Sequence, residues 1–412
     1  MGYGEARAYD EVATALLAEG GLGDAWVDGA PRFSLTPDVL SAADFGALSA
    51  AAEAVAALHD EGVRLCLADP ALRARYLPLS PVQELLWQSS GGRWHGLARA
   101  DVFFTDGGLQ VCELNSDTPS GEPEAVILNA AAQAQAMGLI DPNRELGARW
   151  VELIETVAGR SSGITLGLCY PTELVEDLAM IKLYAGWARA RGIEVVLGSP
   201  YNLVAVGDGV GMFGRRCDVI WRHYKTDWWT ERVPVWDDEP PPSDHQPLVR
   251  PLALLLSAEA RRQVAVLNPF GSVLTQNKRM LALLWEERAR LSEAGRLALE
   301  KWVPPTVRLE TLPADAARVD WVLKSDFGCE GAEVLVGAEV DEAVWAAARR
   351  HALPRRWIAQ RRFVARLDQA GSSHNHGVYV LAGRTAGVFT RVQRGATDER
   401  AVNVPTLVEG CA

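Results

Sequence analysis

The chain has 412 residues, of which 48% are hydrophobic and 23% charged, the range of ordinary globular proteins. Lysine and arginine together number 41 against 53 acidic residues, and the net charge of −12 argues against a nucleic-acid partner, which needs a basic surface. No apolar run is long enough to span a bilayer and the first residues do not resemble a secretion signal, so we expect no membrane partner.

Cysteine and lysine are used sparingly. The six cysteines are scattered without a CxxC pair, which favours neither a disulfide framework nor a zinc site and predicts a reduced, cytoplasmic protein. Only five of the 41 basic residues are lysines, so a lysine inside a motif draws attention to its compact, flexible ammonium group.

The first part of the chain predicts a helix, a hairpin and a second helical region. Residues 42–59 have the apolar spacing of an amphipathic helix. Residues 98–104 and 109–115 are β-like and flank a Thr-Asp-Gly-Gly turn, which predicts an antiparallel hairpin. Residues 124–158 predict helix, interrupted near Asp141.

Alternating strand and helix signals follow, which is typical of a doubly wound α/β lobe. Residues 163–170 and 193–199 predict buried strands, and the helix between them is expected from Pro171 to Gly192. A hairpin and a further strand at 218–222 complete this lobe.

The predicted fold class is therefore α/β with α+β lobes, divided into three parts. Residues 1–160 hold the N-terminal helices and the hairpin, 161–250 the doubly wound lobe, and 251–412 a second lobe of helices followed by strands. A proline-rich loop at 236–251 marks the last boundary.

One face of the hairpin carries the residues of greatest chemical interest. A register that pairs Asp101 with Glu113 also pairs Arg99 with Asn115, so all four share a face, while Cys112 is expected on the opposite, packed face. This register requires a three-residue Asp-Gly-Gly turn with a bulge at its glycine. Two carboxylates and an amide oxygen would suit Mg²⁺; a solvated hairpin face is the alternative.

These residues and those that follow form the pattern R-x-D-x(11)-E-x-N-x-x-[ST]-x-S, which resembles the signature of the glutathionylspermidine synthase family. These proteins are ATP-grasp ligases whose metal-binding strands precede their nucleotide lysines, in circularly permuted order. The resemblance implies an ATP-grasp fold with a doubly wound pre-ATP-grasp lobe. It also implies that Asp101, Glu113 and Asn115 ligate Mg²⁺, and that Arg99, Thr118 and Ser120 face the reacting group or the substrate.

Further segments resemble the family's motifs in the same order: 274–285, 322–334, 357–364 and 386–395. By that resemblance, ATP would be bound by Lys278, Lys324, Gly328, Gly331 and Gln360. Arg391 would be a second catalytic arginine beside Arg99, and Asp227 would contact substrate. From the residues alone, Lys278 could equally be an ordinary lysine at a helix start and residues 328–331 an ordinary turn.

The resemblance implies an ATP-dependent carboxylate–amine ligase that forms an amide through an acyl phosphate, with ATP and Mg²⁺ as cofactors. A peptide-like carboxylate donor and an amine acceptor would be its partners, glutathione and a polyamine in the family. The amidase domain of bifunctional members is not expected, because the resemblance begins near residue 80. The alternatives are a peptide or amino-acid ligase of natural-product biosynthesis, a small-molecule kinase, and a non-catalytic nucleotide-binding protein.

The chain departs from the family pattern at three places. Cys329 stands where members often carry an arginine, and Ser325 replaces a proline. Lys225 interrupts an acidic substrate segment at 223–231. These departures favour a changed carboxylate donor.

His374 and His376 form a His-Asn-His sequence that could hold a metal. Because Gly and Ser residues precede them, we interpret them as surface histidines of a loop instead.

Overall fold

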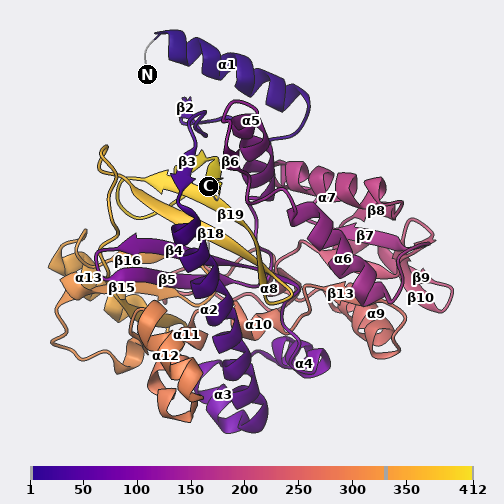
Figure 1. The fold of residues 1–412 in the computed structure, drawn as a ribbon. Coiled ribbons are helices and arrows are strands. Elements are labelled where there is room, and N and C mark those ends of the chain that lie inside the picture. Colours follow the sequence, from indigo (N-terminus) through magenta and orange to yellow (C-terminus); the bar gives the residue numbers. More distant parts are fainter. Residues whose placement is uncertain (1–2, 329–332, 411–412) are drawn as a thin grey trace.

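The computed structural model describes residues 3–328 and 333–410, and Figure 1 shows the arrangement of their helices and strands. A parallel sheet flanked by helices lies on one side, and two antiparallel sheets account for most of the other strands. The predicted α/β class with α+β lobes is therefore confirmed. Within the described ranges, no helix combines the length and the apolar character that crossing a bilayer requires.

The first antiparallel sheet contains the predicted hairpin at one edge. Its order is β20-β19-β18-β4-β5, so strands from the end of the chain pair with the hairpin strand β4. The strands are β4 (Leu97–Thr105), β5 (Gly108–Asn115), β18 (Ser373–Leu381), β19 (Arg384–Gln393) and β20 (Val402–Val404).

A long helix, α2 (Ala42–Ala68), covers one face of this sheet (Figure 1). Ser41 caps the helix by accepting a hydrogen bond from an amide of its first turn. The buried face of α2 packs against side chains of β4 such as Ala100. Because side chains alternate along a strand, Arg99 and Asp101 point to the opposite face of the sheet.

The second antiparallel sheet has the order β14-β17-β15-β16. Its strands are β14 (Thr306–Arg308), β15 (Trp321–Ser325), β16 (Val334–Val336) and β17 (Trp357–Arg361). Helix α13 (Glu342–His351) packs on one face, where Leu323 and Trp357 are fully buried. Lys324 and Gln360 alternate with these core residues, so they belong to the other face.

The parallel sheet has the order β13-β12-β7-β8 and contains the strands predicted for the doubly wound lobe, together with β13, which lies beyond the predicted end of that lobe at residue 250. Helices pack on both of its faces, α6 and α7 on one and α9 on the other. The stacked rings of Trp150 and Tyr184, 4.8 Å apart, join α6 to α7. The elements are β7 (Thr165–Cys169), β8 (Glu194–Gly198), β12 (Val219–Arg222), β13 (Ala265–Leu267), α6 (Leu146–Ala158), α7 (Leu178–Ala190) and α9 (Val249–Ala260).

The other elements are short or peripheral. The remaining strands are β1 (Trp26–Val27), β2 (Ala30–Pro31), β3 (Asp38–Leu40), β6 (Leu139–Ile140), β9 (Leu203–Val206), β10 (Gly209–Met212), β11 (Arg215–Arg216) and β21 (Thr406–Glu409). The remaining α-helices are α1 (Tyr3–Ala18), α3 (Pro70–Tyr76), α4 (Pro81–Ser90), α5 (Asn129–Gln133), α8 (Thr226–Trp229), α10 (Ser272–Thr275), α11 (Arg279–Glu286) and α12 (Glu293–Trp302).

Two predicted helices have different ends in the structure. Helix α7 begins at Leu178 instead of Pro171, because the chain first forms a turn and then a 3₁₀ segment, η2 (Val175–Asp177). Helix α2 continues past residue 59, because Val63 and Cys66 extend its buried face.

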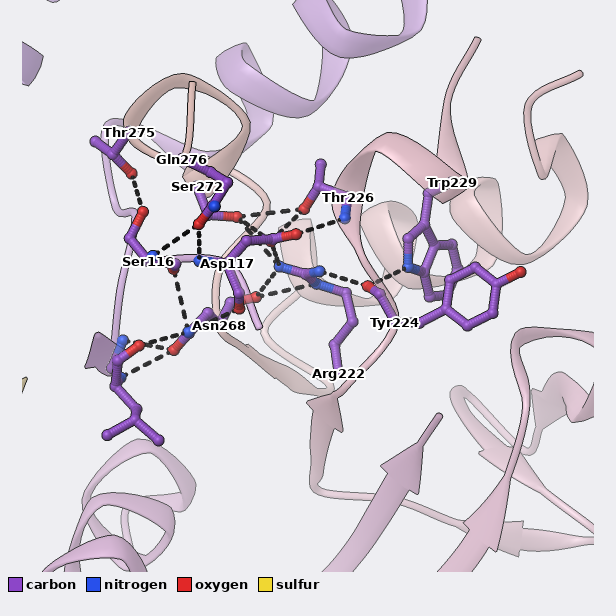
Figure 2. A network of polar contacts seen from close by, with 12 residues as sticks. Ser116, Asp117, Arg222, Tyr224, Thr226, Trp229, Asn268, Ser272, Thr275 and Gln276 are labelled. Carbon is purple, nitrogen blue, oxygen red and sulfur yellow. Dashed lines mark hydrogen bonds and ion pairs between the residues drawn. The ribbon is translucent and has the colours of Figure 1, made fainter. Parts of the chain in front are cut away.

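A buried ion pair joins the parallel-sheet lobe to the end of the hairpin (Figure 2). Arg222, the last residue of β12, is fully buried, and its Nη2 donates to Oδ1 of Asp117 at 2.6 Å. The same guanidinium donates to the main-chain carbonyls of Tyr224 and Asn268. The Asp117 carboxylate also accepts hydrogen bonds from Thr226 and Ser272.

Every member of this network therefore has partners for its charge or its hydrogen-bonding groups. Burial alone would raise the pKa of Asp117, but Arg222 and the hydroxyl donors outweigh it and hold that pKa below its ordinary value. The Asn268 side chain extends the network by donating to the carbonyls of Leu97 and Asp117. The start of β4, the end of β5 and the parallel sheet are thus held together at one point.

We predict that breaking this pair destabilises the protein strongly. Asp117→Asn and Arg222→Met each leave a buried charge without its partner, which costs about 3 kcal/mol or more of unfolding free energy. The double variant should lose less than the sum of the two single losses, since it buries no unpaired charge. Urea unfolding of the four proteins measures this coupling.

The control is Arg7→Ala, which breaks an exposed ion pair with Glu11 and should change the unfolding free energy by at most about 0.5 kcal/mol. Strictly additive losses in the double variant would show that Asp117 and Arg222 do not act as a pair.

Candidate functional site

A cavity of about 700 Å³ is walled by the inner faces of the two antiparallel sheets and by loops of the parallel-sheet lobe. It brings together most of the residues that the sequence singled out. Those that line it are Arg99, Asp101, Glu113, Asn115, Thr118, Ser120, Asp227, Lys324, Gln360 and Arg391. Its size suits a small-molecule ligand.

The register of the hairpin explains why the two carboxylates meet in this cavity. Asp101 pairs directly with Glu113, and Arg99 with Asn115, as predicted. The predicted three-residue turn is wrong, because Thr105 pairs with Gly108 across a two-residue turn. The register shifts between Asp101 and the next pair, so the extra residue lies beside the carboxylates and not at the turn.

The extra residue of this bulge is Cys112. The expectation that Cys112 points to the packed face of the hairpin is wrong. Cys112 lines the cavity together with Glu113, since a bulge interrupts the alternation of side chains. Its main-chain oxygen accepts hydrogen bonds from Nζ of Lys324 and Nε2 of Gln360, each at 3.3 Å. Burial raises the pKa of the Cys112 thiol to about 12, so the thiol is neutral at physiological pH.

Asp101 lies between two arginines. Nε of Arg99 donates to Oδ1 at 3.0 Å, and Nη2 of Arg391 donates to Oδ2 at 2.6 Å. Burial would raise the pKa of Asp101, but these guanidinium groups hold it at about 2. Gly377 on β18 leaves room for Arg99, because a Cβ there would lie 2.7 Å from Cδ of the arginine.

Glu113 and Asn115 are held from the opposite side by residues near α11. Nε2 of Gln276 donates to the amide oxygen of Asn115, and Nδ2 of Asn115 donates to Glu113 at 3.1 Å. Nζ of Lys278 lies 3.5 Å from Glu113 and donates to the carbonyl of Gly328. Lys278 thus does not line the main cavity itself, but it contacts Glu113, which does.

The glycine-containing loop is described only in part. Ser325 donates to Glu333 and accepts a hydrogen bond from the amide of Gly328 at 3.0 Å, so this hydroxyl joins the two ends of the loop. Cys329 and Gly331 lie outside the described residues.

The predicted substrate residues lie at the end of the cavity next to the parallel-sheet lobe. Thr118 directly follows the buried Asp117. Ser120 contributes its main-chain oxygen, which accepts from Nη1 of Arg99 at 2.6 Å. Burial raises the pKa of Asp227 to about 6, and Lys225 opposes part of that rise.

Asn375 was missed by the sequence interpretation. It pairs with Arg391 across β18 and β19, lines the cavity, and its Nδ2 donates to Asp101 at 3.3 Å. Its Oδ1 is buried and accepts no hydrogen bond from any described residue. Nothing in the sequence marks it, because only the pairing of β18 with β4 brings it next to Asp101.

The oxygen atoms that the first antiparallel sheet presents to the cavity fit a hard divalent cation. Asp101 and Glu113 supply two carboxylates, Asn115 an amide oxygen, and the unpaired Oδ1 of Asn375 a further one. In the structure, Arg391 pairs with Asp101 and Lys278 with Glu113, so a bound cation would compete with these two side chains for the carboxylates. The predicted Mg²⁺ ligands are thus brought together.

Comparison with known proteins identifies the family. The family model "glutathionylspermidine synthase preATP-grasp" matches residues 39–409. Among solved structures, a glutathione synthetase-like effector from Globodera pallida, in its apo form, has a TM-score of 0.60 at 12% identity, over 97% of this chain and 96% of that chain. A Methylobacillus flagellatus protein with the provisional name gamma-glutamylcysteine synthetase has a TM-score of 0.46 at 12% identity, over 79% of this chain and 82% of that chain.

No curated protein sequence matches the chain. The likeness to the Globodera pallida protein extends over nearly all of both chains and shows a shared fold. Because the family model spans most of the sequence, the chain belongs to the glutathionylspermidine synthase family of ATP-grasp ligases.

Proposed function

We propose that this chain is an ATP-dependent carboxylate–amine ligase that forms an amide through an acyl phosphate. One observation carries the proposal: within a single cavity, the paired carboxylates Asp101 and Glu113 face three cationic side chains, Arg99, Lys324 and Arg391. Phosphoryl transfer to a carboxylate gathers several negative groups, and a site with cations and metal ligands suits it. The family match supports the same reaction class.

The nucleotide binds at the inner face of the second antiparallel sheet. Lys324 provides an ammonium group for the phosphates, and Gln360 provides an amide for the base. Lys278 contacts phosphate from the other side, where its contact with the carbonyl of Gly328 gives way to the stronger attraction of an anion.

Asp101, Glu113 and Asn115 would hold Mg²⁺, with Asn375 as a further oxygen ligand. The cation would supply neutralisation of the phosphate charge. Arg391, which pairs with Asp101 in the structure, would then be available to the substrate.

The two arginines act on the reacting carboxylate. A donor carboxylate oxygen attacks the γ-phosphorus, the bond to the β-phosphate bridging oxygen breaks, and ADP leaves. Nε of Arg391 is buried and, among the described residues, has no hydrogen-bond partner, so it is available for a donor oxygen. Arg99 stabilises the oxyanion when the amine attacks the acyl carbon and phosphate leaves with loss of a proton.

The amine acceptor binds at the end of the cavity near α8. The Asp227 carboxylate attracts a cationic amine, and the main chain around Thr118 and Ser120 shapes the pocket. We propose a peptide-like donor and an amine acceptor, with glutathione and a polyamine as the first pair to test.

The experiment is an ADP-release screen of carboxylates crossed with amines, in the presence of ATP and Mg²⁺. A ligase releases ADP only when both a carboxylate and an amine are present. Release with one substrate alone would indicate a kinase, and no release with any pair would indicate a nucleotide-binding protein.

We predict that Lys324→Ala and Lys278→Ala each weaken ATP affinity or turnover at least tenfold, about 1.4 kcal/mol, because each removes a phosphate-neutralising charge. Calorimetry with ATP and Mg²⁺ and steady-state assays measure the effect. Lys301→Ala, in α12, removes an exposed lysine and should change neither quantity. Unchanged binding and turnover in both site variants would remove these lysines from the nucleotide site.

We predict that Arg99→Lys lowers kcat about 100-fold while the KM for ATP stays nearly the same. Lysine keeps the positive charge but lacks the guanidinium group, whose Nε and Nη1 donate to Asp101 and to the Ser120 carbonyl at the same time. Removing one hydrogen-bond donor to an oxyanion typically lowers kcat by about 10²–10³. Arg7→Lys is the matched control, since Arg7 is exposed. A rise in the KM for ATP at constant kcat would instead assign Arg99 to the nucleotide.

A further inference from the structure

A second cluster of metal-ligating side chains lies on the other face of the first antiparallel sheet. His374 and His376 both belong to β18, so the expectation of a surface loop is wrong. They alternate with Asn375, which lines the cavity, and therefore point away from it. Asp38, at the start of β3, reaches them from the other end of the sequence.

The three side chains converge on one point. Oδ2 of Asp38 lies 3.2 Å from Nδ1 of His374 and 3.0 Å from Nε2 of His376. All three potential ligand atoms lie within 4.8 Å of one another. Ligands of a tetrahedral Zn²⁺ with bonds near 2.0 Å are about 3.3 Å apart, so small side-chain movements would admit the ion.

A fourth residue holds His374 in the form that a metal needs. Nε2 of His374 lies 3.3 Å from Oδ2 of Asp368, whose other oxygen accepts hydrogen bonds from the amides of Ala370 and Ser372. Without a metal, Nδ1 faces the Asp38 carboxylate as a donor; a metal ion would take the place of the Nδ1 proton, while Asp368 keeps the other proton on Nε2. Metal-bound histidines commonly have such a carboxylate partner.

His376 makes the site partly enclosed. Its side chain is 2% exposed, and the ring of Phe104 packs edge-on against it at 5.4 Å. Within the described chain its Nδ1 is buried without a hydrogen-bond partner, so His376 has no second carboxylate of the kind that Asp368 provides to His374.

We propose that Asp38, His374 and His376 form a binding site for a divalent transition metal, with Zn²⁺ as the preferred ion and Asp368 as a positioning residue. Imidazole nitrogens favour Zn²⁺ over Mg²⁺, so this site is chemically distinct from the all-oxygen group in the cavity. Three protein ligands leave one coordination position for water. A bound ion ties the N-terminal segment before α2 to the central strand β18.

The test loads the full chain, stripped of metal by a chelator, with Co²⁺ as a spectroscopic probe and Zn²⁺ as competitor. The parent should take up one Co²⁺ that gives the intense visible bands of four-coordinate cobalt and is displaced by Zn²⁺. Asp38→Asn and His374→Ala should lose these bands, and Asp368→Asn should keep them with affinity about 10–100-fold weaker.

The matched control is His351→Ala. His351 lies beside Asp237 and Asp238 in an exposed group with similar atom spacing, and its removal should leave cobalt binding unchanged. Circular dichroism checks that each variant is folded. Histidine ¹⁵N NMR of the parent adds a test that needs no substitution: Zn²⁺ should shift two of the seven imidazoles.

Weak, octahedral cobalt bands in the parent, or equal affinity in His374→Ala, would overturn the proposal. So would Zn²⁺ addition that shifts none of the imidazole signals. These readouts do not involve ligase activity, so the metal site and the proposed reaction can fail independently.

Discussion

The buried pair of Asp117 and Arg222 is the constraint on which both the hairpin end and the parallel-sheet lobe depend. A guanidinium with no access to water must be fully neutralised, and Asp117 does this while also accepting hydrogen bonds from Thr226 and Ser272. Asp117 lies two residues beyond β5, and Thr226 begins α8. The positions of the hairpin end and of Asp227, next to Thr226, are therefore set by one electrostatic requirement.

Charge also explains why the cavity keeps its shape. The strands of the first sheet present apolar side chains to α2 and charged ones to the cavity, so only one face can close by hydrophobic packing. On the open face, Asp101 is bound by two arginines and Glu113 lies beside a lysine. A ligand that enters exchanges these internal pairs for its own, which reduces the free-energy cost of removing its charges from water.

The sequence could predict what depends on local pattern. The pairing of Asp101 with Glu113 follows from the strand period, and the parallel lobe follows from alternating strands and helices. The turn could not be predicted in detail. A bulge at Cys112 and a bulge at the turn both place Asp101 opposite Glu113, so this pairing does not show where the extra residue lies. The position of Asn375 beside Asp101 could not be predicted, because it depends on β18 pairing with β4. The contact of Asp38 with the two histidines could not be predicted either, because it depends on β3 lying next to β18.

The bulge at Cys112 serves the contact between the two antiparallel sheets and not the pairing of the carboxylates. On the turn side of the bulge the two strands pair in one register, and on the site side in another. If Cys112 were deleted, Glu113 would follow Val111 directly and would still lie opposite Asp101, so the two carboxylates would stay on the same face. The deletion would instead remove the main-chain oxygen that accepts hydrogen bonds from Lys324 and Gln360, and with it a direct link between the hairpin and the second sheet.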